Sequence, residues 1–199
     1  MSCPPSPPIT EPPAYPQCMR RIIAIAGLAV FGGVLFGPAA PASARSYDTW
    51  SAVSDALGGS QTPWEPRRTL GLARDPKLGI DVTRCKGKKG SAIRVRYASP
   101  KARRMFYAVQ QPNGVACVKT TMAGYGKVGM VKAHGFVFDI YARCGKTTCP
   151  KSSVARRGMV QMRPAGPGAT VSTVRIATKG LSYDEVMWVT EGLTLNTFN

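Results

Sequence analysis

Apolar and polar residues alternate most clearly between positions 91 and 97. Ile93, Val95 and Tyr97 alternate there with Arg94 and Arg96, which is the two-residue period of a strand with one apolar and one cationic face. Weaker apolar runs bounded by turn residues predict three further strands, at residues 78–84, 159–162 and 170–178.

The segment from residue 105 to residue 122 predicts a β-hairpin. Residues 105–111 and 115–122 are its two strands, and Asn113-Gly114 between them readily adopts the positive φ angles of a tight turn. A helix is the alternative, because Ser99-Pro100 is a suitable start and the apolar residues that follow also fit helical spacing, namely Ala102, Met105, Phe106 and Val109.

Residues 131–144 predict either one long strand or a strand with a bulge at Gly135. On this interpretation His134 shares a face with the phenylalanines that follow it. Asp139 points to the opposite face, because successive side chains of a strand alternate.

Two helices are predicted, one near each end of the region after residue 45. The first covers residues 46–57 and ends at Gly58-Gly59, with apolar residues at helical spacing at Tyr47, Trp50, Val53 and Leu57. The second begins with an S-x-x-E capping box of Ser182 and Glu185, and its apolar stripe consists of Val186, Val189 and Leu193. Between them, residues 60–68 predict a loop with Trp64 as a packing anchor.

These elements predict a single α+β domain over residues 45–199. We expect an antiparallel sheet of about five to seven strands, with the N-terminal and C-terminal helices packed on one face and disulfides stabilising it.

The region before residue 45 has the pattern of an export signal. Arg20-Arg21 is a positive start, residues 22–36 are apolar, and Ala42-Ser43-Ala44 offers a cleavage site that would leave Arg45 as the first mature residue. Residues 1–18 are rich in proline and predict either a disordered segment or a wrongly assigned start. We therefore expect residues 19–44 to be a signal peptide and the protein to be extracytoplasmic. The alternative is an uncleaved signal anchor that tethers it to a membrane.

The chain is strongly basic. Its 27 Lys and Arg exceed its 10 Asp and Glu by 17, and leaving out Arg20, Arg21 and Glu11 reduces the formal charge of the mature chain to +16. Such an excess favours anionic partners, namely nucleic acid, anionic lipid or an envelope polymer. A generally basic surface without a specific ligand is the alternative interpretation.

Nine cations occur within twenty-one residues, and they are the predicted anion-binding residues. Stacking partners close to them in sequence are Tyr97, Phe106 and Tyr107. The nine are Arg84, Lys86, Lys88, Lys89, Arg94, Arg96, Lys101, Arg103 and Arg104.

Six cysteines occur, of which Cys3 and Cys18 precede the export segment. An even number of remaining cysteines in an exported chain predicts two disulfides. Cys144 and Cys149 flank a short flexible segment, so we expect them to pair with each other and Cys85 to pair with Cys117. A zinc site is not expected, because the chain has one histidine and only one loose cysteine pair.

The sequence contains no motif that fixes a reaction, and no cofactor is expected. The leading hypothesis is a secreted, non-enzymatic binding or structural protein with affinity for anionic polymers or surfaces. One alternative is a small nuclease-like hydrolase that uses His134, with Asp139 as the other weak catalytic candidate. The other alternative is a cationic inhibitor or toxin that acts on another protein.

Overall fold

Residues 44–119 and 121–197 are described by a computed structural model. They form a nine-stranded sheet in which every pairing is antiparallel. In spatial order its main path runs β1 (Arg45–Tyr47), β4 (Ile80–Arg84), β5 (Ser91–Ser99), β6 (Arg104–Gln111), β10 (Thr173–Lys179), β9 (Gly158–Met162), β8 (Phe136–Arg143) and β7 (Tyr125–Ala133). The short β3 (Ala73–Arg74) pairs with β5 beyond the end of β4.

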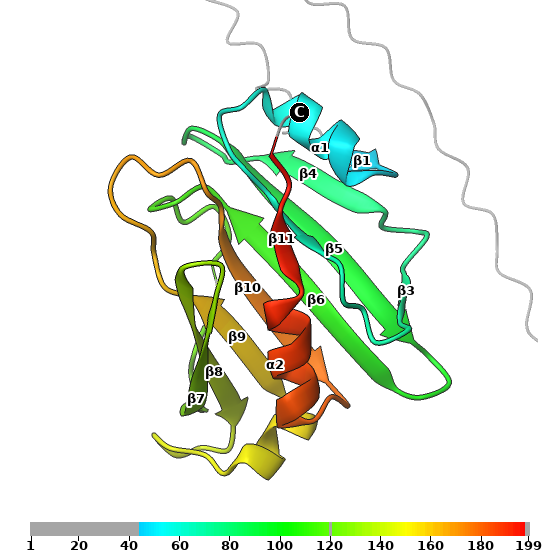
Figure 1. Ribbon diagram of the computed structural model, residues 1–199, viewed down its shortest axis with the longest axis vertical. Coiled ribbons are helices and arrows are strands. Elements are labelled where there is room, and N and C mark those ends of the chain that lie inside the picture. Colours follow the sequence, from blue (N-terminus) through cyan, green and yellow to red (C-terminus); the bar gives the residue numbers. More distant parts are fainter. Residues whose placement is uncertain (1–43, 120, 198–199) are drawn as a thin grey trace, which may run out of the picture. The chain divides into compact units, whose positions relative to one another are not determined.

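A thinner second layer covers one face of this sheet (Figure 1). It consists of α1 (Trp50–Leu57), α2 (Tyr183–Glu191) and a small sheet of β2 (Trp64–Pro66) and β11 (Leu193–Leu195), while a 3₁₀ turn, η1 (Lys151–Ala155), leads into β9. We call the face beneath this layer the covered face and the other the open face.

Strand alternation decides which side chains enter the core. In β5, Ile93, Val95 and Tyr97 are buried on the covered face, whereas Arg94 and Arg96 stand on the open face, as the sequence predicts. Neighbouring strands add Phe106, Ile176, Val160 and Phe138 to the same core.

Trp64 anchors the second layer to the sheet, which confirms its predicted packing role. Its side chain is fully buried, and its indole N–H donates to the Ser172 carbonyl at 2.8 Å. The side-chain amide of Gln110, also buried, accepts from the Trp64 backbone N–H at 2.7 Å and donates to the Trp64 carbonyl at 2.6 Å. The predicted loop at 60–68 therefore contains a short strand, and a side chain bonds both backbone polar groups of its first residue, Trp64.

Both helices begin at side-chain caps. Thr49 accepts a hydrogen bond from the Ala52 N–H at the start of α1. At the start of α2 the predicted capping box is present, with Ser182 and Glu185 each bonding the other's backbone N–H. Each helix is short, at eight and nine residues.

The α+β fold class predicted from the sequence is wrong, because the described chain is mostly antiparallel sheet. Nine strands make the main sheet and two make a second one, with only two short helices against them. The strand number was underestimated because β1, β2, β3 and β11 are two or three residues long and show no periodic pattern.

The predicted hairpin over residues 105–122 is also wrong. Its first half is β6, but β6 pairs with β5 on one side and with β10 on the other. After the turn at 112–114 the described chain forms no strand before β7. The cause is visible in its contacts: the Gln111 side chain accepts from the Cys117 and Val118 N–H groups, and Cys117 is bonded to Cys85, so this segment folds back over the end of the sheet.

The predicted long strand over 131–144 is instead a hairpin, β7 and β8, joined by a two-residue turn. Both turn residues have positive φ, 51° at His134 and 79° at Gly135. Two positive φ angles in succession reverse the chain, as in a type I′ turn, so Gly135 ends a strand and is not a bulge within one.

The predicted segment 1–18 and all of the predicted signal peptide except Ala44 lie outside the described residues. Arg45 is the first residue of β1 and pairs with Val82. Across the described ranges, no helix combines the length and the apolar character that a bilayer crossing requires.

Candidate anion-binding surface

The nine predicted cations lie in three separate places along β4, β5 and β6. Arg84, Lys86, Lys88 and Lys89 are at or after the end of β4, at one end of the sheet. Arg94 and Arg96 are on the open face of β5. Lys101, Arg103 and Arg104 are at the opposite end of β5, which is about 30 Å long at the rise of an extended strand. The nine therefore do not form one patch.

Several of these cations already have partners within the protein. Arg94 contacts Asp81 at 3.0 Å, and Arg96 lies 3.6 Å from Asp75. Arg104 pairs with Glu185 at the start of α2, and the Lys88 ammonium donates to the Ala116 carbonyl at 3.0 Å. The three carboxylates offset part of the positive charge that a ligand would meet. The Lys88 contact is to a neutral carbonyl and restricts the position of the ammonium group.

Of the predicted stacking residues only Tyr107 is on the open face. Tyr97 and Phe106 stack on each other in the core with ring centroids 4.8 Å apart. Tyr107 stands opposite Arg96 in the register of β5 and β6. Burial raises the pKa of Tyr107, an effect that nearby Arg94 partly offsets.

A row of side chains crosses the open face beside Tyr107. Each member is the register partner of the next, so neighbours are about 5 Å apart along the row. We call it the tyrosine row, and from β5 to β7 it consists of Arg96, Tyr107, Ala177, Met159, Tyr141 and Lys127. Tyr141, which the sequence did not single out, is the second aromatic residue of this row.

One end of the open face opens into a hollow of about 640 Å³ lined by four cations. The other described residues that line it, Gly124, Cys144 and Gly145, include no acidic residue. None of the four cations is in a salt bridge with another described residue. We call this site the four-cation hollow, and its cations are Arg143, Arg156, Arg157 and Lys179.

Backbone pairing brings these four cations together from three parts of the chain. Arg143 ends β8, Lys179 ends β10, and Arg156 and Arg157 lie between η1 and β9. The Arg143 N–H donates to the Arg157 carbonyl at 3.0 Å, which places these two side by side. Lys179 lies two residues after Ala177 of the tyrosine row, and Arg143 two residues after Tyr141, so the hollow continues that row along the strands.

The rim of the hollow is fixed by the predicted disulfide between Cys144 and Cys149, whose Cα atoms are 6.0 Å apart. The Gly124 carbonyl accepts from both the Cys144 and the Gly145 N–H. A side chain at Gly126 would collide with the Lys146 carbonyl, so this close approach requires glycine. The second predicted disulfide, between Cys85 and Cys117, is also present.

The sequence did not reveal the hollow because its residues are distant from one another along the chain. Arg143 and Lys179 end strands whose pairing becomes clear only in the fold. The alternation of side chains along a strand was the one clue in the sequence. It places Tyr141 and Arg143 on one face of β8, and Ala177 and Lys179 on one face of β10.

Asp139 forms the strongest ion-pair cluster on the open face. Arg163 bonds both of its carboxylate oxygens, at 2.8 and 2.9 Å, and the Lys127 ammonium is 2.8 Å from one of them. These hydrogen bonds, Arg163 first, hold the pKa of Asp139 at about 2. The Asp139 carboxylate is therefore held by Arg163 and Lys127. It does not contact His134, so it does not orient that ring.

His134 and Asp139, the weak catalytic candidates, are not brought together. The His134 ring contacts the Glu191 carbonyl at 3.2 Å and lies 6.1 Å from the Trp64 ring, next to the second layer of the covered face. Asp139 faces the other side of the sheet, with Arg163 and Lys127. The part of the chain described also contains no group of three His, Cys, Asp or Glu arranged to bind a metal ion.

No protein-family model, curated protein or solved structure has significant similarity to this chain.

Proposed function

We propose that this chain is an exported, non-enzymatic protein that binds a phosphate-bearing anionic polymer through the four-cation hollow. The observation that carries the proposal is the convergence of Arg143, Arg156, Arg157 and Lys179 on one hollow without an acidic residue in its lining. Like charges brought this close repel one another, so an anion that enters the hollow relieves a cost already present in the folded protein.

Arginine and lysine together suit phosphate in particular. Three guanidinium groups can each offer two parallel N–H donors to phosphate oxygens, and the ammonium of Lys179 adds a compact charge. All four side chains are exposed, so they remain able to adjust to the ligand.

A polymer fits better than a single small anion because the hollow continues into the tyrosine row. A chain with one phosphate in the hollow can extend past Tyr141 and Met159 toward Tyr107 and Arg96. The bases of a nucleic acid would meet aromatic surface there. A base-free polyphosphate would gain less from the row, because its two cations, Arg96 and Lys127, are already paired with Asp75 and Asp139.

Binding is expected to depend steeply on salt. Fluorescence anisotropy with labelled single-stranded DNA and with long-chain polyphosphate measures this directly. The logarithm of the affinity should fall linearly with the logarithm of the salt concentration, because each neutralised phosphate releases counter-ions. Equal affinity in low and moderate salt would contradict the proposal.

A pair of variants with the same charge change locates the site. The hollow variant replaces Arg143, Arg156, Arg157 and Lys179 with Gln. The control variant replaces four exposed cations elsewhere, Lys86, Lys89, Lys101 and Arg103, with Gln. We expect the hollow variant to lose at least about tenfold in affinity and most of the salt slope, and the control to lose much less. Equal losses would mean that net charge, and not the hollow, drives binding.

A further inference from the structure

A second cavity, of about 180 Å³, lies on the open face at the end opposite the four-cation hollow. One wall is formed by residues of β6, β9 and β10, and the other by residues 114–118 and Pro164. Most of its surface is apolar, contributed by Val109, Val115, Ala116, Val118 and Pro164. Among the described residues, Arg175 of β10 is the only charged side chain in the lining.

Arg175 is a partly buried cation that has neither a carboxylate partner nor a hydrogen-bond partner for its Nε among the described residues. Its Nε is shielded from solvent and has no hydrogen-bond partner among the described residues. No Asp or Glu of those residues pairs with it. Burial lowers the pKa of its guanidinium, which is the expected effect of removing a cation from water without a counter-charge.

The arginines on either side of Arg175 each have a carboxylate partner, whereas Arg175 has none among the described residues. In one row across the sheet, Arg94 is bonded to Asp81 on one side and Asp139 is bonded to Arg163 on the other. Arg175 lies between these pairs, with the uncharged Val109 and Gln161 as its register partners. The sheet therefore provides a carboxylate for each neighbouring arginine and none for Arg175.

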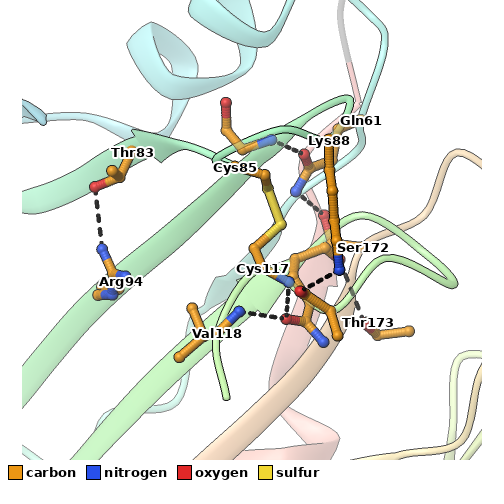
Figure 2. Close-up of a disulfide and its surroundings, with 12 residues drawn as sticks. Gln61, Thr83, Cys85, Lys88, Arg94, Cys117, Val118, Ser172 and Thr173 are labelled. Atoms are coloured by element: carbon orange, nitrogen blue, oxygen red, sulfur yellow. Dashed lines mark hydrogen bonds between the residues drawn. A yellow bond between two sulfur atoms is a disulfide. The ribbon is translucent and has the colours of Figure 1, made fainter. Parts of the chain in front are cut away.

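The outer wall of the cavity is held in place covalently. Residues 115–118 are attached to the sheet by the Cys85–Cys117 disulfide, by Gln111 and by the Lys88 contact to Ala116 (Figure 2). The opposite wall includes Thr173. The turn before it is tied to the loop at 165–166 by the side chain of Asn113. A disulfide and several side-chain hydrogen bonds therefore hold the outer wall of the cavity against the sheet.

We propose that this cavity binds a small organic carboxylate, whose apolar group fills the space between the two walls and whose carboxylate pairs with Arg175. We call it the carboxylate cavity. Guanidinium pairs with carboxylate through parallel hydrogen bonds, and a cavity of roughly this size accommodates an aromatic ring of the size of benzene. Gln111, Gln161 and Thr173 in the lining supply further polar contacts that can orient the ligand.

Benzoate is the probe that matches this chemistry, and benzyl alcohol is its uncharged analogue. We expect saturable binding of benzoate in titration calorimetry, with binding of benzyl alcohol at least tenfold weaker. Benzoate should also raise the thermal unfolding midpoint of the protein, because a ligand that binds only the folded state stabilises it. The absence of saturable benzoate binding would overturn the proposal.

Two variants separate the role of Arg175 from a general effect of charge. Arg175→Gln should abolish the benzoate-induced rise in the unfolding midpoint, while its own midpoint in buffer stays equal or rises, because an unpaired buried cation has been removed. Arg96→Gln is the matched control, since its Nε is also buried and unpartnered among the described residues but it does not line the cavity. It should bind benzoate like the parent protein.

Benzoate binding that survives in Arg175→Gln would show that the carboxylate is held elsewhere, and would overturn the assignment. Binding to the hollow variant, in which Arg143, Arg156, Arg157 and Lys179 are Gln, should be unchanged. Benzoate binding and polymer binding are measured separately and at different sites. Failure of the carboxylate proposal therefore leaves the polymer proposal testable, and the reverse also holds.

Discussion

At the scale of single residues, the open face is organised by how its few carboxylates are distributed. Asp81 and Asp139 each hold arginines in place, and Arg175 between them has none. Strand parity in the sequence predicts that Arg94 and Arg96 share a face. It cannot predict which cations are paired, because the partners of Asp139 come from β7 and from the residue after β9.

Replacing Asp139 with Asn tests the ion-pair cluster through the pH dependence of stability. The folded pKa of Asp139, about 2, is below its ordinary value of 3.8, so its contribution is fully present above about pH 4 and is lost as the pH falls toward 2. Arg163 and Lys127 are about half exposed, so the loss at neutral pH should be only about 1 kcal/mol of unfolding free energy.

Urea unfolding of Asp139→Asn and the parent protein across this range measures the effect. The two stabilities should differ at neutral pH and converge near pH 2. A difference that persists at the acid end would show that Asp139 acts through packing and not through its charge.

At the scale of elements, patterns local in sequence were predicted well and patterns that depend on distant partners were not. The capping box of α2 and the alternation of β5 each lie within a few residues, and both are present. The Asn113-Gly114 pattern suggested a hairpin, yet β6 finds its second partner in β10, more than sixty residues later along the chain. Residue types near a turn do not specify which strand will pair with β6.

The sequence does not predict the turn between β7 and β8 because His134-Gly135 is not one of the residue pairs, such as Asn-Gly or Asp-Gly, that mark a two-residue hairpin turn. Only His134 and Gly135 connect the two strands, so their backbone conformations set the register of the hairpin. His134 is thus a turn residue whose ring contacts the end of α2.

Substitutions in this turn distinguish its two residues. Gly135→Ala should lower the unfolding free energy by about 1 kcal/mol or more, because φ of 79° is strained for any residue with a Cβ atom. His134→Asn should cost less, since asparagine tolerates positive φ, although it loses the contact to Glu191. Denaturant unfolding gives both values, and a larger loss for His134→Asn would mean that the ring contact outweighs the turn conformation.

At the scale of the whole molecule, charge is the dominant property. The formal charge of the full chain is +17, and the cations that converge in the four-cation hollow come from three separate parts of the chain. Composition predicted an anionic partner in general terms. The location could not follow from composition, since the densest cluster in the sequence, from Arg84 to Arg104, is spread over both ends of the sheet.

Self-repulsion of this size should make stability depend on ions. We expect the thermal unfolding midpoint to rise from low to moderate sodium chloride, because screening weakens repulsion within the folded protein. At equal ionic strength, phosphate should raise it further by occupying the four-cation hollow. The variant with four Gln residues in the hollow should keep the chloride effect and lose the additional effect of phosphate. An equal phosphate effect in both proteins would place phosphate binding elsewhere.

We expect carboxylate binding to depend on the oxidation state of the Cys85–Cys117 pair. Arg175 belongs to β10, whereas the opposing wall of the carboxylate cavity is joined to the sheet through Cys117. In a newly made chain with reduced thiols, that wall lacks its covalent attachment. We therefore expect the protein with reduced thiols to bind benzoate more weakly than the oxidised protein, because hydrogen bonds such as those of Gln111 and Lys88 then hold the wall without a covalent link.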